Sequence, residues 1–463
     1  MTTSPVEVDL VVIGTGPGGE SLATRAASAG LHVVAVERHL VGGECPYYGC
    51  IPSKIMLRAA DALAEAQRAG RLAGEVSIVP SWSPVAQRVA EATADWDDTA
   101  AVERLQRAGA TVIHGTGRLD GPRRVVVTPA DGTGPTAYAA RIGVVLNPGT
   151  SPATPPIEGL SATPYWTNRD AVRATALPRE LIVLGGGPIG CELAQVFARF
   201  GARVTIVQHG PRLLSGDEPE AAAALQQVLV EEGVRVMTDA EAVLVAHDMQ
   251  GFTLTLDSGE IVTGDRLLVA AGRHRNLDDI GLESVGLTPE MLEVDDRLRA
   301  ADGLWVIGDV AGHGAFTHVS MYQAAIALRS VLHAAGQGEE GAAADYRALP
   351  HTTFTDPEVA GVGLTEEAAR QTGLSVRVGQ TDLAASSRGY THGPGATGLV
   401  KIVEDAEAGV LVGASVVGPT GGEILAMLTL AVHARVPVAT LRTMIYAYPT
   451  FHRAIESALD DLG

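Results

Sequence analysis

Lysine, cysteine and aromatic residues are all scarce in this chain of 463 residues. It has only three cysteines, and aromatic residues make up 4% of it. Three cysteines cannot build a disulfide framework, so the chain is not a small scaffold held together by cross-links. The low aromatic content predicts cores filled by aliphatic side chains. Lysine occurs only at Lys54 and Lys401, because arginine supplies nearly all of the basic charge.

Long apolar runs and a surplus of positive charge are missing as well. No stretch approaches the roughly 20 apolar residues that span a bilayer, and the apolar segment near the N-terminus lacks the basic start of a signal peptide. The formal charge of −20 opposes binding to nucleic acids and to anionic membrane surfaces, because both are negatively charged. We therefore expect a cytoplasmic protein with no membrane and no nucleic-acid partner.

The N-terminal segment has the pattern strand, glycine-rich turn, helix, strand. A mostly β-branched run from Val8 to Ile13 leads into Gly14-Thr15-Gly16-Pro17-Gly18-Gly19, and an alanine-rich stretch continues to Ala29. A second apolar run, Leu31 to Val36, is closed by Glu37. Glycines let a pyrophosphate approach the helix N-terminus, and the acidic residue suits a ribose. The pattern predicts a dinucleotide-binding βαβ unit.

The same pattern returns about 170 residues later. Leu181 to Leu184 precedes Gly185-Gly186-Gly187-Pro188-Ile189-Gly190, a helix to about Phe200 and a strand from Arg203 to Val207. Either glycine motif alone is weak evidence, because ordinary turns also contain glycine. Two complete units predict two bound dinucleotides, each with its pyrophosphate on a helix N-terminus.

The length implies two to four domains. A proline-rich linker from Asn147 to Gly159, a crossing at Gly272 to Asn276 and a polar stretch from Gly336 to Ala344 separate them. From His351 onward, β-branched runs are followed by helices, which favours an α+β domain that could serve an interface. We predict an α/β fold with two doubly wound dinucleotide domains and this C-terminal domain. The predicted boundaries are 1–150 and 273–345 for the first domain, 151–272 for the second and 346–463 for the third.

A cysteine pair follows the first βαβ unit, in Gly42-Gly43-Glu44-Cys45-Pro46-Tyr47-Tyr48-Gly49-Cys50-Ile51-Pro52-Ser53-Lys54. The segment resembles the active site of the class I pyridine nucleotide-disulfide oxidoreductases, the group of dihydrolipoamide dehydrogenase and of glutathione, mycothione and mercuric reductases. The resemblance extends along the chain. Gly308-Asp309 is similar to the second FAD motif of the family, and Phe354-Thr355-Asp356-Pro357-Glu358 to the start of its dimerisation domain.

The resemblance implies a homodimeric flavoenzyme that passes electrons from NADH or NADPH through FAD to a Cys45–Cys50 disulfide and on to a thiol or disulfide substrate. It implies that Cys50 is the thiol beside the flavin and Cys45 the interchange thiol, and that Glu192 pairs with Lys54 beside the flavin. Glu192 could instead merely cap its own helix. A helix N-terminus and a nearby ammonium lower a thiol pKa, so we expect Lys54 to do so here. We interpret Cys191 as a packed core thiol, and we expect no metal cofactor.

The resemblance and the two glycine motifs together predict the cofactor-binding residues. These are Gly14, Thr15, Gly16, Pro17, Gly19, Glu37, Arg38, Gly43, Lys54, Gly117, Gly149, Gly185, Gly187, Gly190, Gln208, Gly272, Asp309 and Thr317. The nicotinamide stays open between NADH and NADPH. Gln208 replaces the acidic residue that would hold the ribose of NAD, and Arg212 nearby fits either a phosphate or a solvated surface position. Gly190 favours NAD, because relatives that use NADP often have alanine there.

The C-terminal end departs from the family pattern. Relatives that reduce organic disulfides carry a His-Pro-Thr sequence followed by a glutamate, and this dyad from the partner subunit protonates the leaving thiol. Here Tyr448 and Arg453 replace the histidine and the glutamate. Tyrosine, with a pKa near 10, is a poor substitute for histidine. Such acid-base help is typically worth about 10²–10⁴-fold in rate.

Several interpretations of this departure remain. His452 and Glu456, four residues apart, could share one helical face and replace the dyad of a disulfide reductase. A metal-ion reductase is possible, because mercuric reductases also carry tyrosine there, although this chain lacks their C-terminal cysteine pair. A quinone or dye reductase would not need the dyad. A non-catalytic redox sensor would leave the retained cysteines, Lys54 and Glu192 unexplained. Tyr47 and Tyr48 either narrow the substrate entrance or simply pack.

Overall fold

The computed structural model describes residues 4–463, which divide into two compact units. The first unit comprises the chain up to Pro52 with Ala90–Ser151 and Arg273–Asp345. The second comprises Ser53–Val89, Pro152–Gly272 and Tyr346–Gly463. Three elements contain residues of both units: α3 (Cys50–Ala69), α4 (Ser83–Ala92) and β6 (Thr150–Pro152). The predicted domain boundaries stay predictions.

The first unit is built on a seven-stranded sheet with the order β1-β2-β3-β4-β5-β16-β15, in which β1 also pairs with β5. Parallel pairing joins β3, β2, β1, β5 and β16. The strands of the sheet are β1 (Val6–Ile13), β2 (Val33–Glu37), β3 (Thr111–Leu119), β4 (Arg124–Pro129), β5 (Thr136–Leu146), β15 (Arg299–Ala301) and β16 (Leu304–Val306). The unit also contains α1 (Pro17–Ser28), α2 (Glu44–Tyr47), α5 (Thr99–Arg107), α9 (Thr317–Ala334) and the short strand β14 (Arg273–Arg275).

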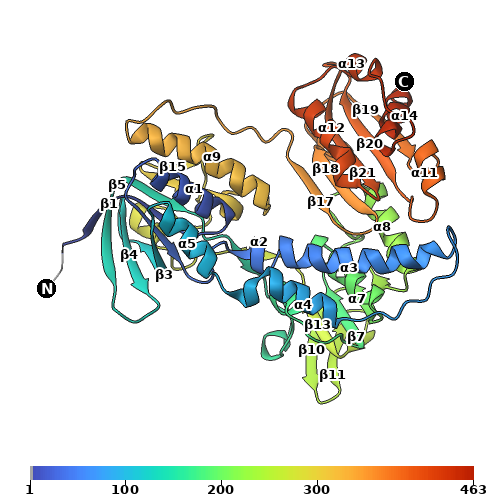
Figure 1. The fold of residues 1–463 in the computed structure, drawn as a ribbon, viewed down its shortest axis with the longest axis horizontal. Helices are drawn as coiled ribbons and strands as arrows, with labels where there is room; N and C mark the ends of the chain where they lie inside the picture. Colours follow the sequence, from blue (N-terminus) through green and yellow to red (C-terminus); the bar gives the residue numbers. More distant parts are fainter. Residues whose placement is uncertain (1–3) are drawn as a thin grey trace. The chain divides into compact units, whose positions relative to one another are not determined.

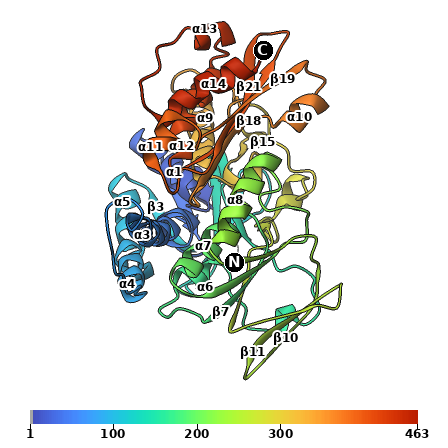
Figure 2. The same ribbon diagram turned by 90° about the vertical axis from the view of Figure 1, so that its right-hand side faces the viewer.

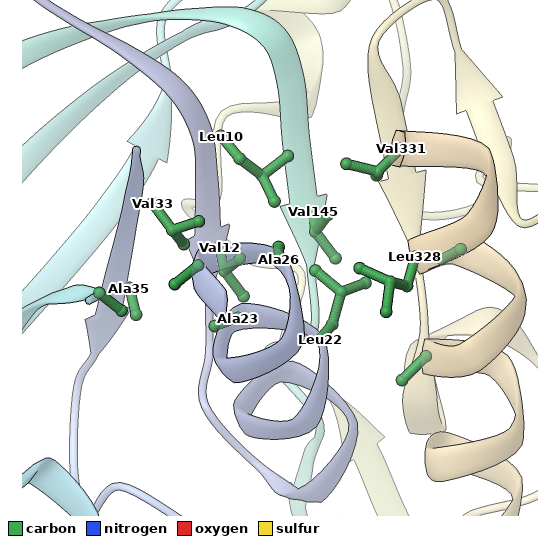
Figure 3. Close-up of a cluster of buried hydrophobic side chains, with 14 of the residues drawn as sticks. Leu10, Val12, Leu22, Ala23, Ala26, Val33, Ala35, Val145, Leu328 and Val331 are labelled. Atoms are coloured by element: carbon green, nitrogen blue, oxygen red, sulfur yellow. The ribbon is translucent and has the colours of Figure 1, made fainter. Parts of the chain in front are cut away.

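Helices α1 and α9 lie side by side against one face of this sheet (Figure 1). Figure 3 shows Leu22 and Ala26 of α1 between Val12 of β1 and Leu328 of α9. These side chains are almost wholly removed from water. Because parallel strands are covered on both faces, their sequences are nearly continuous apolar runs, and all five residues of β2 are buried. This packing fixes the carboxyl ends of β1 and β2, where the predicted FAD residues follow.

The second unit contains a parallel sheet with the order β13-β7-β8-β9 and an antiparallel sheet β10-β11-β12. Figure 2 shows β10 and β11 as a projecting hairpin. The strands are β7 (Glu180–Leu184), β8 (Arg203–Val207), β9 (Arg235–Met237), β10 (Ala242–Asp248), β11 (Gly251–Leu256), β12 (Ile261–Gly264) and β13 (Arg266–Val269). The helices of this part are α6 (Asn168–Val172), α7 (Pro188–Arg199) and α8 (Pro219–Glu231).

The C-terminal part of the second unit is a five-stranded antiparallel sheet with the order β17-β18-β21-β20-β19. Its strands are β17 (Pro350–Thr353), β18 (Glu358–Gly363), β19 (Val376–Asp382), β20 (Leu399–Asp405) and β21 (Val410–Gly418). Its helices are α10 (Glu366–Gln371), α11 (Ser387–His392), α12 (Gly421–His433), α13 (Val438–Arg442) and α14 (Ala454–Asp461). A mixed sheet with five parallel strands, a second sheet that is wholly parallel and a C-terminal antiparallel sheet with helices confirm the predicted fold class.

Lys401 lies in β20 with its side chain 2% exposed. Its neighbours Val400 and Ile402 belong to the apolar core that contains residues of α12 and α14. Because side chains alternate along a strand, Lys401 points to the opposite face. There its ammonium binds Glu218 at 3.0 Å, Glu220 at 3.1 Å and Glu366 at 3.0 Å. Burial works against the charge, but the three carboxylates raise the pKa of Lys401 to about 12.

We expect Lys401→Met to lower the free energy of unfolding by about 3–5 kcal/mol, because it leaves three carboxylates without their buried cation. The raised pKa means that this contribution is complete below the ordinary lysine pKa of about 10.4 and is lost as the pH rises through about 12. Denaturant unfolding at pH 8 measures the loss. Arg124→Met, at an exposed strand position, is the control and should change stability by less than about 0.5 kcal/mol. Equal losses in both variants would contradict the assignment.

Candidate functional site

Glycines hold the cysteine segment against the first dinucleotide loop. Gly43, which precedes α2, has a φ of +70°, and a Cβ there would lie 2.7 Å from the Cα of Gly16. Cys45 lies in α2, and Cys50 is the first residue of α3. All three cysteines of the chain are in the thiol form. The segment approaches the predicted FAD loop this closely because neither Gly16 nor Gly43 has a side chain.

The sulfur of Cys50 lies 3.3 Å from the hydroxyl oxygen of Thr317. Thr317 is the first residue of α9, and Cys50 is the first residue of α3. The N-termini of two long helices therefore adjoin this sulfur. Helix N-termini carry partial positive charge and stabilise anions, and the hydroxyl can donate a hydrogen bond to a thiolate. Cys50 is well placed to carry a negative charge.

The surroundings of Cys45 disfavour a negative charge on its sulfur. The hydrogen bond with Cys50, together with burial, raises the pKa of the Cys45 thiol. Because the two thiols interact this closely, they titrate as a pair. The expectation that Lys54 lowers the thiol pKa is wrong for Cys45. The Lys54 ammonium is already bound to Glu192 at 2.8 Å, so its charge is largely offset there.

The first glycine loop fits the pyrophosphate of FAD. No side chain caps the N-terminus of α1 at Gly16, so its backbone amides are left for a ligand. Gly14 has a φ of +90°, and a Cβ there would lie 2.2 Å from the carbonyl oxygen of Asn147. A Cβ at Gly19 would lie 2.1 Å from the carbonyl oxygen of Gly14. The tight cradle therefore requires glycine at both positions, as the motif predicts.

Two carboxylates lie at further positions predicted to bind FAD. Glu37 is buried and accepts hydrogen bonds from the N–H of Thr15 at 2.8 Å and from its hydroxyl at 2.9 Å. Asp309 accepts from the hydroxyl of Thr150 at 2.5 Å, and Arg273 donates to the same hydroxyl oxygen at 2.6 Å. These bonds orient both carboxylates for ligand hydroxyls. Their roles in FAD binding remain predictions.

The second glycine loop repeats the arrangement in the second unit. No side chain caps α7 at Gly187, and a Cβ at Gly190 would lie 2.0 Å from the carbonyl oxygen of Gly185. The side-chain oxygen of Gln208 accepts from the N–H of Gly186 at 2.7 Å. Arg212 donates to the carbonyl oxygens of Ser215 and Asp217, at 2.9 and 3.4 Å. The loop therefore fits a second pyrophosphate, and Arg212 is tied to its own loop.

The other predicted cofactor residues have less specific surroundings. Arg38 is exposed at the end of β2. A Cβ at Gly117 would lie 3.2 Å from the side chain of Ile13, which is a tight contact. Gly149 and Gly272 have positive φ values of +66° and +113° with open space around them. These four residues stay predictions without a geometric argument of their own.

Lys54 and Glu192 form an ion pair in the second unit. The ammonium lies 3.0 and 2.8 Å from the two carboxylate oxygens of Glu192, whose side chain is only 6% exposed. One of these oxygens also accepts from the backbone N–H of Phe354 at 2.8 Å. A buried carboxylate without a cation would be costly, so the pairing explains both charges. Glu192 is therefore more than a helix cap.

The C-terminal segment carries His452 and Glu456, the two residues predicted to replace the dyad. His452 lies in a 3₁₀ turn, Phe451–Arg453, that precedes α14, and its ring is 5.8 Å from that of Tyr446. Glu456 instead binds Arg453 at 2.7 Å. The 3₁₀ turn runs directly into α14, and the role of His452 and Glu456 as a replacement dyad stays a prediction. Tyr448 is 69% exposed and lies over the Arg453 guanidinium at 5.6 Å.

Sequence reasoning did not identify Asn147 as a site residue. It is buried at the carboxyl end of β5. With its amide oxygen toward Gly19 it accepts from that N–H at 3.0 Å and donates to the carbonyl of Ile307 at 3.2 Å. A polar residue directly after a parallel strand was the available signal, because ligands bind at the carboxyl ends of such strands.

The remaining expectations concern a metal site, a membrane span and the third cysteine. Among residues 4–463, no cluster of three or more histidine, cysteine, aspartate or glutamate side chains is arranged to hold a metal ion. Within the same residues, no helix is both long enough and apolar enough to span a bilayer. Cys191 is fully buried, its thiol is 3.3 Å from the carbonyl oxygen of Gly186, and burial raises its pKa. It therefore has the surroundings of a core thiol.

Comparison with known proteins agrees with this geometry. Residues 8–327 match the family described as pyridine nucleotide-disulphide oxidoreductase, and residues 349–459 match its dimerisation domain. The chain belongs to the pyridine nucleotide-disulphide oxidoreductase family. It is accordingly a flavoprotein oxidoreductase that uses FAD and NAD(P)H, and the dimerisation domain supports a homodimer.

Relatives within the family include enzymes with different acceptors. The chain is 35% identical to a dihydrolipoyl dehydrogenase of Thermus scotoductus, over 98% of this chain and 97% of the relative. It is 34% identical to a mercuric reductase of Streptomyces lividans, over 97% and 95%. Its fold is similar to the Cu(II) complex of an HOCl-induced flavoprotein disulfide reductase from Escherichia coli, with a TM-score of 0.84, 26% identity and coverage of 98% and 99%. Family membership therefore leaves the acceptor open.

Proposed function

We propose that this oxidoreductase passes two electrons from NADH through FAD and the Cys45–Cys50 pair to a thiophilic metal ion. FAD, when bound, accepts hydride at one face and delivers electrons to the cysteines. The observation that carries the proposal is that Tyr448 stands at the position of the family histidine while both Cys45 and Cys50 are retained. Reduction of a disulfide needs an acid-base group, the family histidine, to protonate the leaving thiol. A metal ion instead binds the two sulfurs, and its reduction releases no thiol.

Reduction of a metal ion by NADH requires no proton to be delivered to a leaving thiol, so the missing dyad is not needed. For Hg(II), NADH and the ion give NAD⁺, a proton and Hg(0); for Cu(II), two ions are reduced to Cu(I). Soft ions prefer thiolate ligands. The similarity to mercuric reductases, and to a disulfide reductase solved with Cu(II), supports this acceptor class. A small disulfide remains the second candidate, because a dihydrolipoyl dehydrogenase is equally similar in sequence.

We infer that NADH is the preferred donor. Arg212 donates from one guanidinium nitrogen to two carbonyl oxygens of its own loop, which restricts where its side chain can reach. His209 is exposed and lies 3.9 Å from the carboxylate of Glu241. One nitrogen of the Arg212 guanidinium is thus held by the loop, and His209 lies near a carboxylate that would repel a phosphate. The Gln208 amide, held by Gly186, has hydrogen-bonding atoms for ribose hydroxyls instead. We also propose that Tyr448 of the partner subunit completes the site around Cys45.

Anaerobic NADH oxidation by the FAD-loaded homodimer tests the proposed acceptor. The acceptors to compare are Hg(II) buffered by excess small thiol, Cu(II), oxidised lipoamide and glutathione disulfide. We expect kcat/KM for a metal ion to exceed that for either disulfide by at least about tenfold, and NADPH to be slower than NADH. Cys45→Ser should abolish turnover of the ion. Faster turnover of a disulfide, or metal-ion turnover unaffected by Cys45→Ser, would overturn the proposal.

A further inference from the structure

Phe354 contacts both members of the Lys54–Glu192 pair. Its ring centroid lies 4.6 Å from the Lys54 ammonium. Its backbone N–H donates to the Glu192 carboxylate at 2.8 Å. The other groups around the ammonium are the Glu192 oxygens and the hydroxyl of Ser53 at 3.3 Å. Phe354 therefore closes a ring of contacts, with its side chain on the cation and its main chain on the anion.

We propose that Phe354 is a positioning residue that holds the Lys54 ammonium on Glu192 through the face of its ring. The inference rests on the proposed function as an NADH-dependent flavoenzyme, and on the position beside the flavin that the family resemblance implies for this ion pair. An aromatic face attracts a cation electrostatically, and the attraction grows when water is excluded. A lysine has a long, flexible side chain with several rotamers. The ring restricts Lys54 to the rotamer that reaches Glu192.

The segment that carries Phe354 is itself fixed by α7. Gln195 accepts from the N–H of Asp356 at 2.8 Å and donates to its carbonyl at 2.8 Å. Arg199 binds the Asp356 carboxylate at 2.8 Å. Glu192, Gln195 and Arg199 are spaced by three and four residues, so they present one helical face to residues 354–356. The main chain that carries Phe354 is therefore held in place by α7, although the residue itself is 39% exposed.

Substitutions at Phe354 distinguish the contribution of its ring from that of its backbone N–H. Phe354→Leu removes the aromatic face but keeps the backbone N–H on Glu192, whereas Phe354→Tyr keeps both. We expect Phe354→Leu to slow flavin reduction by NADH roughly threefold to tenfold, and Phe354→Tyr to restore it. Site-specific fluorination at 354, with one, two and five fluorines, weakens the ring face at nearly constant shape. The rate should then fall stepwise with the number of fluorines.

A double-mutant cycle tests whether the ring acts through Lys54. In a Lys54→Met background, Phe354→Leu should cause no additional slowing, because the cation is gone. Equal slowing in both backgrounds, or no trend across the fluorinated series, would overturn the inference. If Phe354→Leu slowed the reaction only by unfolding the segment, Phe354→Tyr and the fluorinated proteins would all match the wild type.

A spectroscopic readout is independent of turnover. The chain has only two lysines, so protein labelled with [ε-¹³C]lysine should give two lysine signals, which Lys54→Met assigns. The ring current of Phe354 should shift the Lys54 signal upfield, and Phe354→Leu should return it toward the ordinary position. The Lys401 signal, from a site without an aromatic contact to that ammonium in residues 4–463, is the internal control. An unshifted Lys54 signal in the wild type would refute the inference, even if the metal-ion reduction proposed above were found.

Discussion

Cys50→Ser should lower turnover of every acceptor that depends on the cysteines by on the order of 10³-fold or more. Two sulfurs must lose two electrons together to form the disulfide, so a single remaining thiol cannot complete the cycle. Flavin reduction by NADH should remain, because Cys50 lies after that step. Stopped-flow absorbance separates the two half-reactions. Loss of flavin reduction together with turnover would show that the substitution had disrupted FAD binding instead.

Cys45→Ser should also abolish acceptor turnover, but its spectrum should differ. Cys50 keeps the Thr317 hydroxyl and the two helix N-termini that favour its thiolate. The oxidised Cys45→Ser protein should therefore show the long-wavelength absorbance of a thiolate beside the flavin, and Cys50→Ser should not. Cys191→Ser, at the buried core thiol, is the control for loss of a sulfur and should keep most of its turnover. Identical spectra for the two cysteine variants would contradict the assigned roles.

The raised pKa of Cys45 predicts how the reactivity of this thiol depends on pH. Its causes are the hydrogen bond with Cys50 and burial. Because the thiolate is the nucleophile, the reactive fraction of Cys45 at neutral pH is smaller than for an ordinary cysteine with a pKa of about 8.5. The rate of alkylation of Cys45 in the reduced protein should still rise with pH above that value. A plateau below pH 8 would show that the pKa is lowered instead.

Tyr448→His combined with Arg453→Glu should raise disulfide reduction by about 10²–10⁴-fold, the usual contribution of general acid-base catalysis. An imidazole can accept the Cys45 proton and return it to the leaving thiol, which a phenol with a pKa near 10 does poorly. The gain should appear with a pH profile that has an inflection near 6.5, the ordinary histidine pKa. Metal-ion turnover should change much less.

Two single variants make this test specific. Tyr448→Phe removes only the phenol hydroxyl and shows whether it has a role of its own. Arg453→Glu alone breaks the bond to Glu456 and places two carboxylates near each other, so it reports the structural cost. If the double variant gains no disulfide activity while its thermal unfolding matches that of Arg453→Glu, the dyad does not limit this chain, and the argument from Tyr448 fails.

Glycine patterns made much of the fold predictable from the sequence. The strand expected at Arg203 to Val207 has those bounds, and Gly14, Gly19 and Gly190 are positions where a Cβ would collide with backbone. Such a requirement is local, so it leaves a mark in the sequence. Strands of a parallel sheet are recognisable in the sequence as well, because both of their faces are covered and their residues form a continuous apolar run.

The electrostatics of the site were not predictable in the same way. The sequence places Lys54 four residues after Cys50, which favoured a lowered thiol pKa, but the charge is bound to Glu192 from a distant segment. His452 and Glu456 have helical spacing, yet Glu456 binds Arg453. Phe354 and Asn147 acquire their contacts only through tertiary packing. The spacing of residues along the chain predicts which side chains are neighbours on one helix or strand. It does not predict contacts with residues from distant segments.

The central claim is that the cysteine pair lies in the electron path, and anaerobic titration of the FAD-loaded wild type with NADH tests it most directly. After two electrons, a long-wavelength band should appear while the flavin remains largely oxidised, because the electrons reside on the dithiol and the Cys50 thiolate adjoins the flavin. The band should be absent in Cys50→Ser. Direct bleaching of the flavin at two electrons, with no such band in the wild type, would contradict the account.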